Sequence, residues 1–330
     1  MLSLVNFTTA VRIKKTLCPL MLGGRTLALG SCFAERIGEK LQRALSPTSI
    51  NPKGIRYNPA SLALDLECSQ ESTQLFLHEN LWRSFLHHSS LAGRTVGESR
   101  ELLRQAEARR SQALDEATLL LVTLGTAQVF QLFSSGTIVS NCHRLPQALF
   151  RRRNLTVEES VAALAPNLCS WLDESCERRV ILTVSPIRHL RGGLIANSRS
   201  KAVLLLACAE LEKLHSRLEY FPAYEIVMDE LRGYRFFEED MIRPNPQAVQ
   251  HIWELFCSTY FRKKERKALD KIEKVQKLAE HRLSPNSKLE DISQKALGWL
   301  GELDTDYPQL QTKELGKFFQ SLEKKSCRER

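Results

Sequence analysis

The first 260 residues alternate between continuous apolar runs and stretches in which apolar residues recur at helical spacing. Apolar runs of five or six residues that end at a turn residue are typical of strands buried on both faces of a sheet. The pattern predicts five strands, over Arg25 to Gly30, Ser49 to Ile55, Leu119 to Leu124, Arg179 to Val184 and Tyr224 to Met228.

Helical spacing predicts what lies between these strands. Helices are expected over Cys32 to Leu45, from Pro59 to about Cys68, over Glu98 to Ala117, Val157 to Leu172 and Asn197 to Leu218, and around Val249, Ile252, Trp253 and Phe256. A hairpin-like insert is expected over Val129 to Val139, with its turn at Ser134-Ser135-Gly136. Strands that alternate with helices indicate an α/β fold, here a three-layer α/β/α sandwich with a mainly parallel sheet.

The character of the chain changes near Arg262, where Lys- and Glu-rich sequence with regularly spaced Leu and Ile begins. We interpret residues 1–258 as one α/β domain and residues 259–330 as a charged helical C-terminal extension. Breaks in this extension are expected at Ser284 to Ser287 and at Asp304 to Pro308, where turn-forming residues gather.

Composition narrows the class of protein. The formal net charge is +9, but the segment from Phe261 onward alone holds 17 basic and 12 acidic residues, so much of the excess belongs to the tail. The basic runs lack interleaved aromatic platforms, so no nucleic-acid partner is expected. No apolar run is long enough to span a membrane and the N-terminus lacks a signal-peptide pattern, so we expect a cytoplasmic protein of unknown oligomeric state.

The nine cysteines are scattered and never form a C-x-x-C pair. Neither structural disulfides nor a zinc site is expected from such spacing. We therefore expect no metal and no cofactor.

The stretch with the clearest chemistry is Gly30-Ser31-Cys32-Phe33-Ala34, which joins the first strand to the first helix. A serine at such a bend lies beside unpaired N–H groups of the helix N-terminus, which can donate to an oxyanion. A serine just before a helix is also a common N-cap.

Further candidates follow the other predicted strands. Gly54, Gly125, His189 and Asp240 each come just after one of them. Because the carboxyl ends of parallel strands share one edge of the sheet, we expect these residues to meet Ser31 in one crevice.

At Gly30 to Ala34 the sequence resembles the GSCFA domain family, a branch of the SGNH (GDSL-like) hydrolases. The likeness continues in family order through Asn51-Pro52-Lys53-Gly54, Tyr57-Asn58-Pro59, Leu124-Gly125-Thr126-Ala127, Asn141-Cys142-His143, Ser185-Pro186-Ile187-Arg188-His189 and Tyr220 to Glu225. The resemblance implies an SGNH or flavodoxin-like sandwich and ester-hydrolase or acyl-transfer chemistry on an acylated sugar or lipid-like ester, so the expected partner is a small-molecule ester or acylated glycan.

The resemblance also implies roles for single residues. Ser31 would be the nucleophile and Gly54 an oxyanion donor. A further donor is expected from the segment after the third strand, at Gly125 or at Asn141, because Ala127 occupies the position where an asparagine is usual. Asn58 joins the substrate-binding candidates.

The last family motif departs from its pattern. Where an Asp-x-x-His is expected, the chain has Asp240-Met241-Ile242-Arg243. Arginine keeps its proton in proteins and cannot act as a base. Three interpretations stay open: His143 or His189 serves as the base, a weak activity persists without one, or the protein is a non-catalytic one that binds an anionic small molecule or glycan through Arg243.

Overall fold

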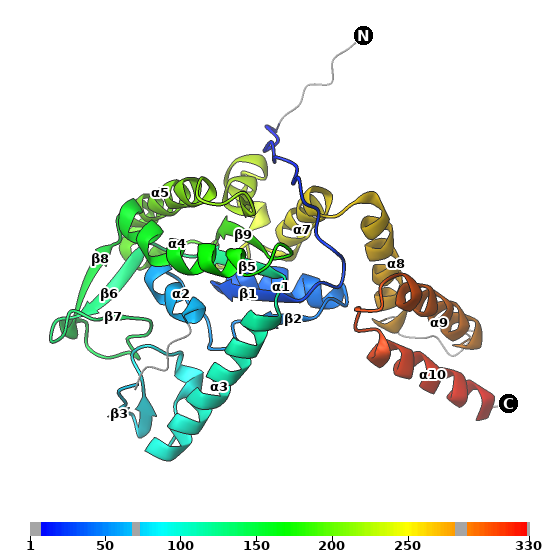
Figure 1. Ribbon diagram of the computed structural model, residues 1–330, viewed down its shortest axis with the longest axis horizontal. Coiled ribbons are helices and arrows are strands. Elements are labelled where there is room, and N and C mark those ends of the chain that lie inside the picture. Colours follow the sequence, from blue (N-terminus) through cyan, green and yellow to red (C-terminus); the bar gives the residue numbers. More distant parts are fainter. Residues whose placement is uncertain (1–7, 68–72, 281–288, 329–330) are drawn as a thin grey trace, which may run out of the picture. The chain divides into compact units, whose positions relative to one another are not determined.

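The structure is a computed structural model that describes residues 8–67, 73–280 and 289–328 (Figure 1). The chain divides into two compact units. Unit 1 comprises residues 1–14, 26–37 and 49–252, and unit 2 comprises residues 15–25, 38–48 and 253–330.

A five-stranded sheet organises the main part of the chain. Its strands are β1 (Thr26–Gly30), β2 (Thr48–Ile50), β5 (Leu119–Leu124), β9 (Arg179–Val184) and β10 (Leu218–Tyr220), in the order β2-β1-β5-β9-β10. The pairs β1–β5, β5–β9 and β9–β10 are parallel. This order is that of the flavodoxin-like doubly wound sheets.

Helices flank the sheet, as the sequence predicts. They are α1 (Cys32–Arg43), α2 (Pro59–Leu66), α3 (Val96–Glu116), α4 (Val157–Asp173), α5 (Gly193–Glu212) and α7 (Pro246–Tyr260). Leu29, Val122 and Leu182 point to the face on which α2, α4 and α5 contribute to the core. Residues that alternate with these along the strands, such as Ala28 and Ile181, point to the other face of the sheet and are also buried. Burial of both faces explains the unbroken apolar runs of these strands. The α/β/α fold is therefore confirmed.

Two smaller sheets lie outside this core. Strands β6 (Gln128–Leu132) and β7 (Ile138–Val139) form the predicted hairpin, and β8 (Phe150–Asn154) pairs with the other edge of β6. Strands β3 (Phe76–His78) and β4 (Leu81–Arg83) form a second hairpin.

The predicted strand Tyr224 to Met228 is wrong. The last strand is β10, and the chain then winds into α6 (Ala223–Glu225) and the π-helical turn Ile226–Glu230. Ile226 and Val227 are both buried on this helical turn. A short apolar run cannot by itself distinguish a strand from a buried helical turn, and here Pro222 separates the run from the strand.

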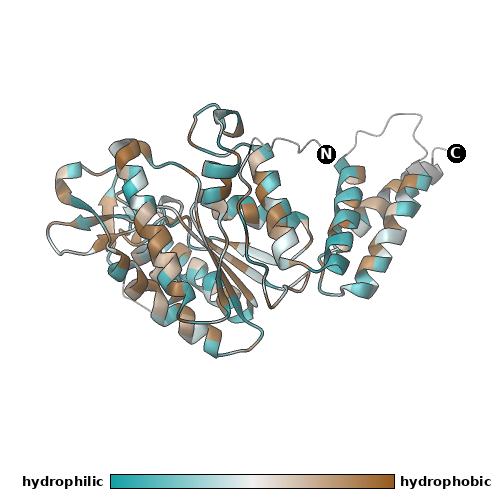
Figure 2. Ribbon diagram, turned by 90° about the horizontal axis from the view of Figure 1, so that it is seen from above, coloured by the Kyte–Doolittle hydropathy of each residue, from teal (hydrophilic) through white to brown (hydrophobic). Residues whose placement is uncertain are grey.

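The described residues of unit 2 continue with the helices α8 (Lys263–Glu280), α9 (Leu289–Asp306) and α10 (Lys313–Arg328). Val275, Ala296, Leu300 and Phe319 form their common core, and hydrophilic residues alternate with hydrophobic ones along these helices (Figure 2). The expected break at Asp304 to Pro308 is confirmed, and the one at Ser284 to Ser287 lies outside the described residues. Within the described part of the chain, no helix combines the length and apolar character required to cross a bilayer.

We expect Gly30→Ala to destabilise the fold strongly. Gly30 has φ +129°, and a Cβ there would lie 2.1 Å from the backbone oxygen of Thr123 on the neighbouring strand. Strain of this kind and the clash together should lower the free energy of unfolding by more than about 2 kcal/mol, measured by urea denaturation.

Gly298→Ala is the matched control for this variant. Gly298 lies inside α9, and a Cβ there would meet nothing within 4 Å. Alanine should raise helix stability there by up to about 1 kcal/mol. Equal effects of the two substitutions would contradict the assignment of strain to Gly30.

Candidate functional site

The candidate site lies at the point where the order of the sheet reverses. From β1 the chain continues to β2 on one side, and the third strand, β5, joins the other side. Ser31 follows β1 directly and Gly125 follows β5 directly. Ligands of open α/β sheets bind in the crevice that this reversal creates at the carboxyl ends of the strands.

Ser31 is 1% exposed, and hydrogen bonds hold both its backbone and its side chain. Its N–H donates to the carbonyl of Thr123 at 3.1 Å, and its Oγ accepts from the N–H of Phe33 at 3.3 Å. Ser31 is thus the N-cap of α1, the alternative interpretation of this residue. A capping hydroxyl uses an oxygen lone pair, so its hydrogen stays available for a base.

Gly125 brings Ser31 and His189 to one point. A Cβ on Gly125 would lie 3.2 Å from the Cβ of Ser31 and 3.2 Å from Nε2 of His189. Only a glycine leaves this space open between them. Tyr57 completes the arrangement, because its carbonyl accepts from the N–H of Gly125 at 2.8 Å and its ring meets the imidazole edge-on at 5.4 Å.

One ring nitrogen of the half-buried His189 has no partner in the described part of the chain. Its Nε2 is buried and has no hydrogen-bond partner within the described residues. Burial, and next the positive charge of Lys201, lower the pKa of His189 from 6.5 to about 4. The ring is therefore neutral at physiological pH, the form that can accept a proton.

The segment after β2 contains two amide groups beside the site, the backbone N–H of Gly54 and the side chain of Asn51. The N–H of Gly54 donates to the carbonyl of Asn51 at 2.7 Å, inside a turn. Oδ1 of Asn51 accepts from the N–H of Gly30 at 2.9 Å. This bond fixes the orientation of the side-chain amide, so Nδ2 points away from Gly30. That Nδ2 is buried and has no partner in the described ranges.

Three predicted residues make structural contacts. Asn58 caps α2 by accepting from the N–H of Ser61 at 2.8 Å. Asn141 accepts from the N–H of His143 at 2.8 Å. Nε2 of His143 lies 2.7 Å from the carbonyl oxygen of Ser84, so this ring nitrogen is already engaged.

Asp240 and Arg243 pair with each other. Nε of Arg243 lies 2.7 Å from Oδ2 of Asp240, whose other oxygen accepts from the N–H groups of Ile242 and Arg243. These bonds lower the pKa of Asp240 to about 2. The loop lies beside that of His189, since the N–H of Arg188 donates to the carbonyl of Ile242 at 3.2 Å.

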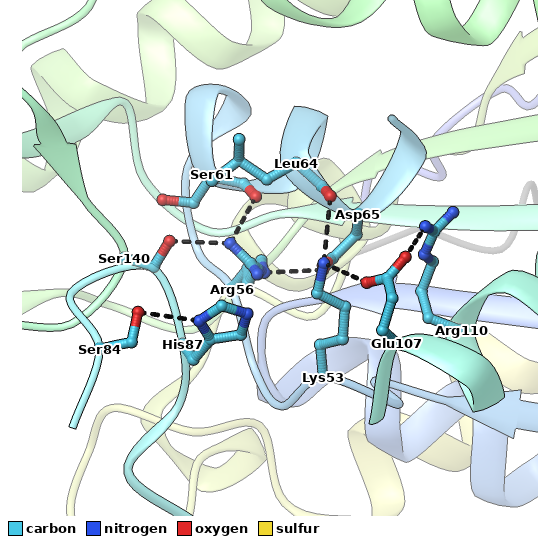
Figure 3. Close-up of polar contacts among 10 residues, drawn as sticks. All are labelled: Lys53, Arg56, Ser61, Leu64, Asp65, Ser84, His87, Glu107, Arg110 and Ser140. Atoms are coloured by element: carbon cyan, nitrogen blue, oxygen red, sulfur yellow. Dashed lines mark hydrogen bonds and ion pairs between the residues drawn. The ribbon is translucent and has the colours of Figure 1, made fainter. Parts of the chain in front are cut away.

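A row of alternating charges anchors the segment between Asn51 and Asn58 (Figure 3). Arg56, 2% exposed, places Nε 2.9 Å from Oδ2 of Asp65, and Lys53 places Nζ 2.9 Å from Oε2 of Glu107. Glu107 also pairs with Arg110. Desolvation raises the pKa of Asp65, against the lowering effect of the nearby cations. The row binds this segment to α2 and α3.

Sequence reasoning missed Asn51, Tyr57 and Lys201 as site residues. The first two stood in motifs without an assigned role. Lys201 lies within α5, where an isolated lysine is expected to be solvated, yet it is 1% exposed. In the described part of the chain, no three His, Cys, Asp or Glu side chains gather in an arrangement that could hold a metal ion.

Comparison with known proteins identifies the family. The model of the GSCFA family matches residues 25–256, which include β1, the candidate site and most of α7. No curated protein matches the sequence. Because the match spans most of the chain, the protein belongs to the GSCFA family.

Proposed function

We propose that the protein is an SGNH-like serine ester hydrolase or acyltransferase in which Ser31 is the nucleophile and His189 is the base. The observation that carries the proposal is the unpartnered, buried Nε2 of His189, which faces the same small space beside Gly125 as Ser31. A neutral imidazole beside a serine is the combination that activates a hydroxyl for acyl transfer.

The reaction divides into two steps. Nε2 of His189 takes the proton of Ser31 as its Oγ forms a bond to the carbonyl carbon of an ester. The tetrahedral intermediate collapses as the carbon–oxygen bond to the leaving alcohol breaks, and the imidazolium returns the proton to that alcohol. Water, or a second alcohol in a transferase, then attacks the acyl-serine in the same way.

The oxyanion needs donors that are free in the resting protein. The unpartnered Nδ2 of Asn51 is one candidate, since the same amide holds Gly30 directly before the nucleophile. The N–H of Cys32, the first residue of α1, is another, because a helix leaves its first amides without intrahelical partners. The next two amides, of Phe33 and Ala34, already donate to the hydroxyl and the carbonyl of Ser31. The amide of Gly54 is engaged in its turn, so we assign this role to Asn51 instead.

Binding of an anion by Arg243 is the weaker alternative. Its guanidinium already pairs with Asp240, so a ligand carboxylate or phosphate would have to displace a carboxylate held by three hydrogen bonds. The pair thus accounts for both charges without a ligand.

Labelling with a fluorophosphonate probe tests the proposal. The wild-type protein should be labelled covalently, and Ser31→Ala should not be, because the phosphorus bonds to the activated serine oxygen. Ser99→Ala is a matched control: Ser99 is also a buried serine whose Oγ accepts from a backbone N–H, that of Gly93, at 2.8 Å, and it belongs to no part of the candidate site. It should keep its labelling. An unlabelled wild-type protein, or labelling that survives Ser31→Ala, would overturn the proposal.

A further inference from the structure

Lys201 is a buried cation that the proposed reaction does not use. Its side chain is 1% exposed and lies on α5, under the carboxyl ends of β5 and β9. Nζ donates to the carbonyl of Gly125 at 2.5 Å and to the carbonyl of Ser185 at 2.6 Å. A lysine is rarely buried this fully without a carboxylate, and within the described residues the hydrogen bonds of Nζ go to these two backbone carbonyls.

The two carbonyls belong to the two loops that build the candidate site. Gly125 leaves β5 and borders Ser31, whereas Ser185 leaves β9 at the start of the loop that carries His189. A single ammonium group therefore fixes the distance between the loop beside the nucleophile and the loop of the base. The same helix holds the second loop again, because Oδ1 of Asn197 accepts from the N–H of His189 at 2.9 Å.

We propose that Lys201 is a positioning residue of this site: its ammonium group clamps the Gly125 and Ser185 loops together and acts through its charge on the imidazole of His189. The importance of Lys201 for catalysis rests on the proposed function, in which His189 is the base. The effect of the Lys201 charge can be tested without any reaction.

The electrostatic part follows from the surroundings of the two groups. The imidazole of His189 lies against the Tyr57 ring and the Gly125 backbone, and Lys201 donates to the carbonyl of that same Gly125. Burial lowers the pKa of His189 most, and the Lys201 charge lowers it further. Nζ of Lys201 faces the two carbonyls and lies 5.9 Å from the centre of the Tyr224 ring. Burial lowers the pKa of Lys201 to about 7. Lys201 is therefore mostly protonated and positively charged below neutral pH, and mostly deprotonated and neutral above it.

An NMR titration of the His189 imidazole tests the proposal, with the resonance assigned through His189→Gln. In the wild-type protein the shift should show its own titration near pH 4 and a second, smaller step near pH 7 as Lys201 loses its proton. In Lys201→Met the second step should vanish and the pKa of His189 should rise by roughly one unit, since a like charge at short range is removed.

Lys213→Met is the matched control, because it removes one positive charge from the C-terminal end of the same helix, at a position where the side chain is 66% exposed. It should leave both steps unchanged. If Lys201→Met does not fold, the step near pH 7 in the wild-type protein decides alone. Absence of that step, or a shift of the pKa of His189 in Lys213→Met equal to that in Lys201→Met, would overturn the proposal.

The two proposals fail in different ways. A protein that shows the coupled titration but no labelling of Ser31 would keep the role of Lys201 and refute the hydrolase function. Labelling of Ser31 without the coupled titration would do the reverse. With both in place, Lys201→Met should also move the acidic limb of the labelling rate to higher pH, at pH values where circular dichroism shows the variant still folded.

Discussion

His189→Ala is expected to lower the rate of fluorophosphonate labelling of Ser31 by about 10²- to 10⁴-fold, the usual contribution of a positioned general base. Loss of the imidazole removes the acceptor for the serine proton, and a serine without a base is a poor nucleophile at neutral pH. Second-order labelling rates, measured at several probe concentrations, check the expectation.

His143→Gln tests which of the two histidines, His143 or His189, is the base, a choice that the sequence left open. His143 is buried and its Nε2 lies 2.7 Å from the Ser84 carbonyl oxygen, so its loss should affect stability rather than the labelling rate. Equal rate losses in the two variants, or a loss only in His143→Gln, would reassign the base.

The pH profile gives an independent check on the same residue. The pKa of His189 is lowered to about 4, so the base is unprotonated above that value and protonated below it. Labelling of the wild-type protein should therefore stay constant from neutral pH to about pH 5 and fall by half near pH 4. An inflection near pH 6.5, the ordinary value for histidine, would contradict the assignment of this base.

Asp65→Leu is expected to lower the free energy of unfolding by about 3–5 kcal/mol, because it leaves the buried cation of Arg56 without its carboxylate. Arg56 is 2% exposed and Asp65 is 1% exposed, so water cannot replace the lost partner. Urea denaturation followed by circular dichroism measures the change.

The double variant Arg56→Met with Asp65→Leu tests the cause. Removal of both charges leaves an apolar pair of similar volume, so it should cost less than Asp65→Leu alone. Glu210→Gln, which breaks the exposed ion pair with Lys213, should change the unfolding free energy little. A double variant less stable than the single one would show that the hydrogen bonds of Arg56 to Ser61 and Ser140 outweigh its ion pair.

The sequence by itself determined the frame of this protein. The apolar runs Leu119–Leu124 and Arg179–Val184 are strands at the predicted bounds, and β1, α1 and α4 agree within a few residues. These elements are readable because the pattern that buries a strand or a helix lies in consecutive residues. The same local pattern placed Ser31 at a strand-to-helix bend and His189 after a strand. Their proposed catalytic roles stay predictions.

Only the tertiary structure decided which of the candidates meet. Three different strands precede Ser31, Gly125 and His189 in the chain. The local sequence around each residue does not indicate that Gly125 leaves a space between the other two. Tertiary contacts also determine that the amide of Gly54 donates within its turn and that Nδ2 of Asn51 has no partner in the described residues. They likewise bury Lys201 against two carbonyls. The physical reason is that hydrogen-bond partners and desolvation depend on neighbours distant along the chain, which a pattern of consecutive residues does not contain.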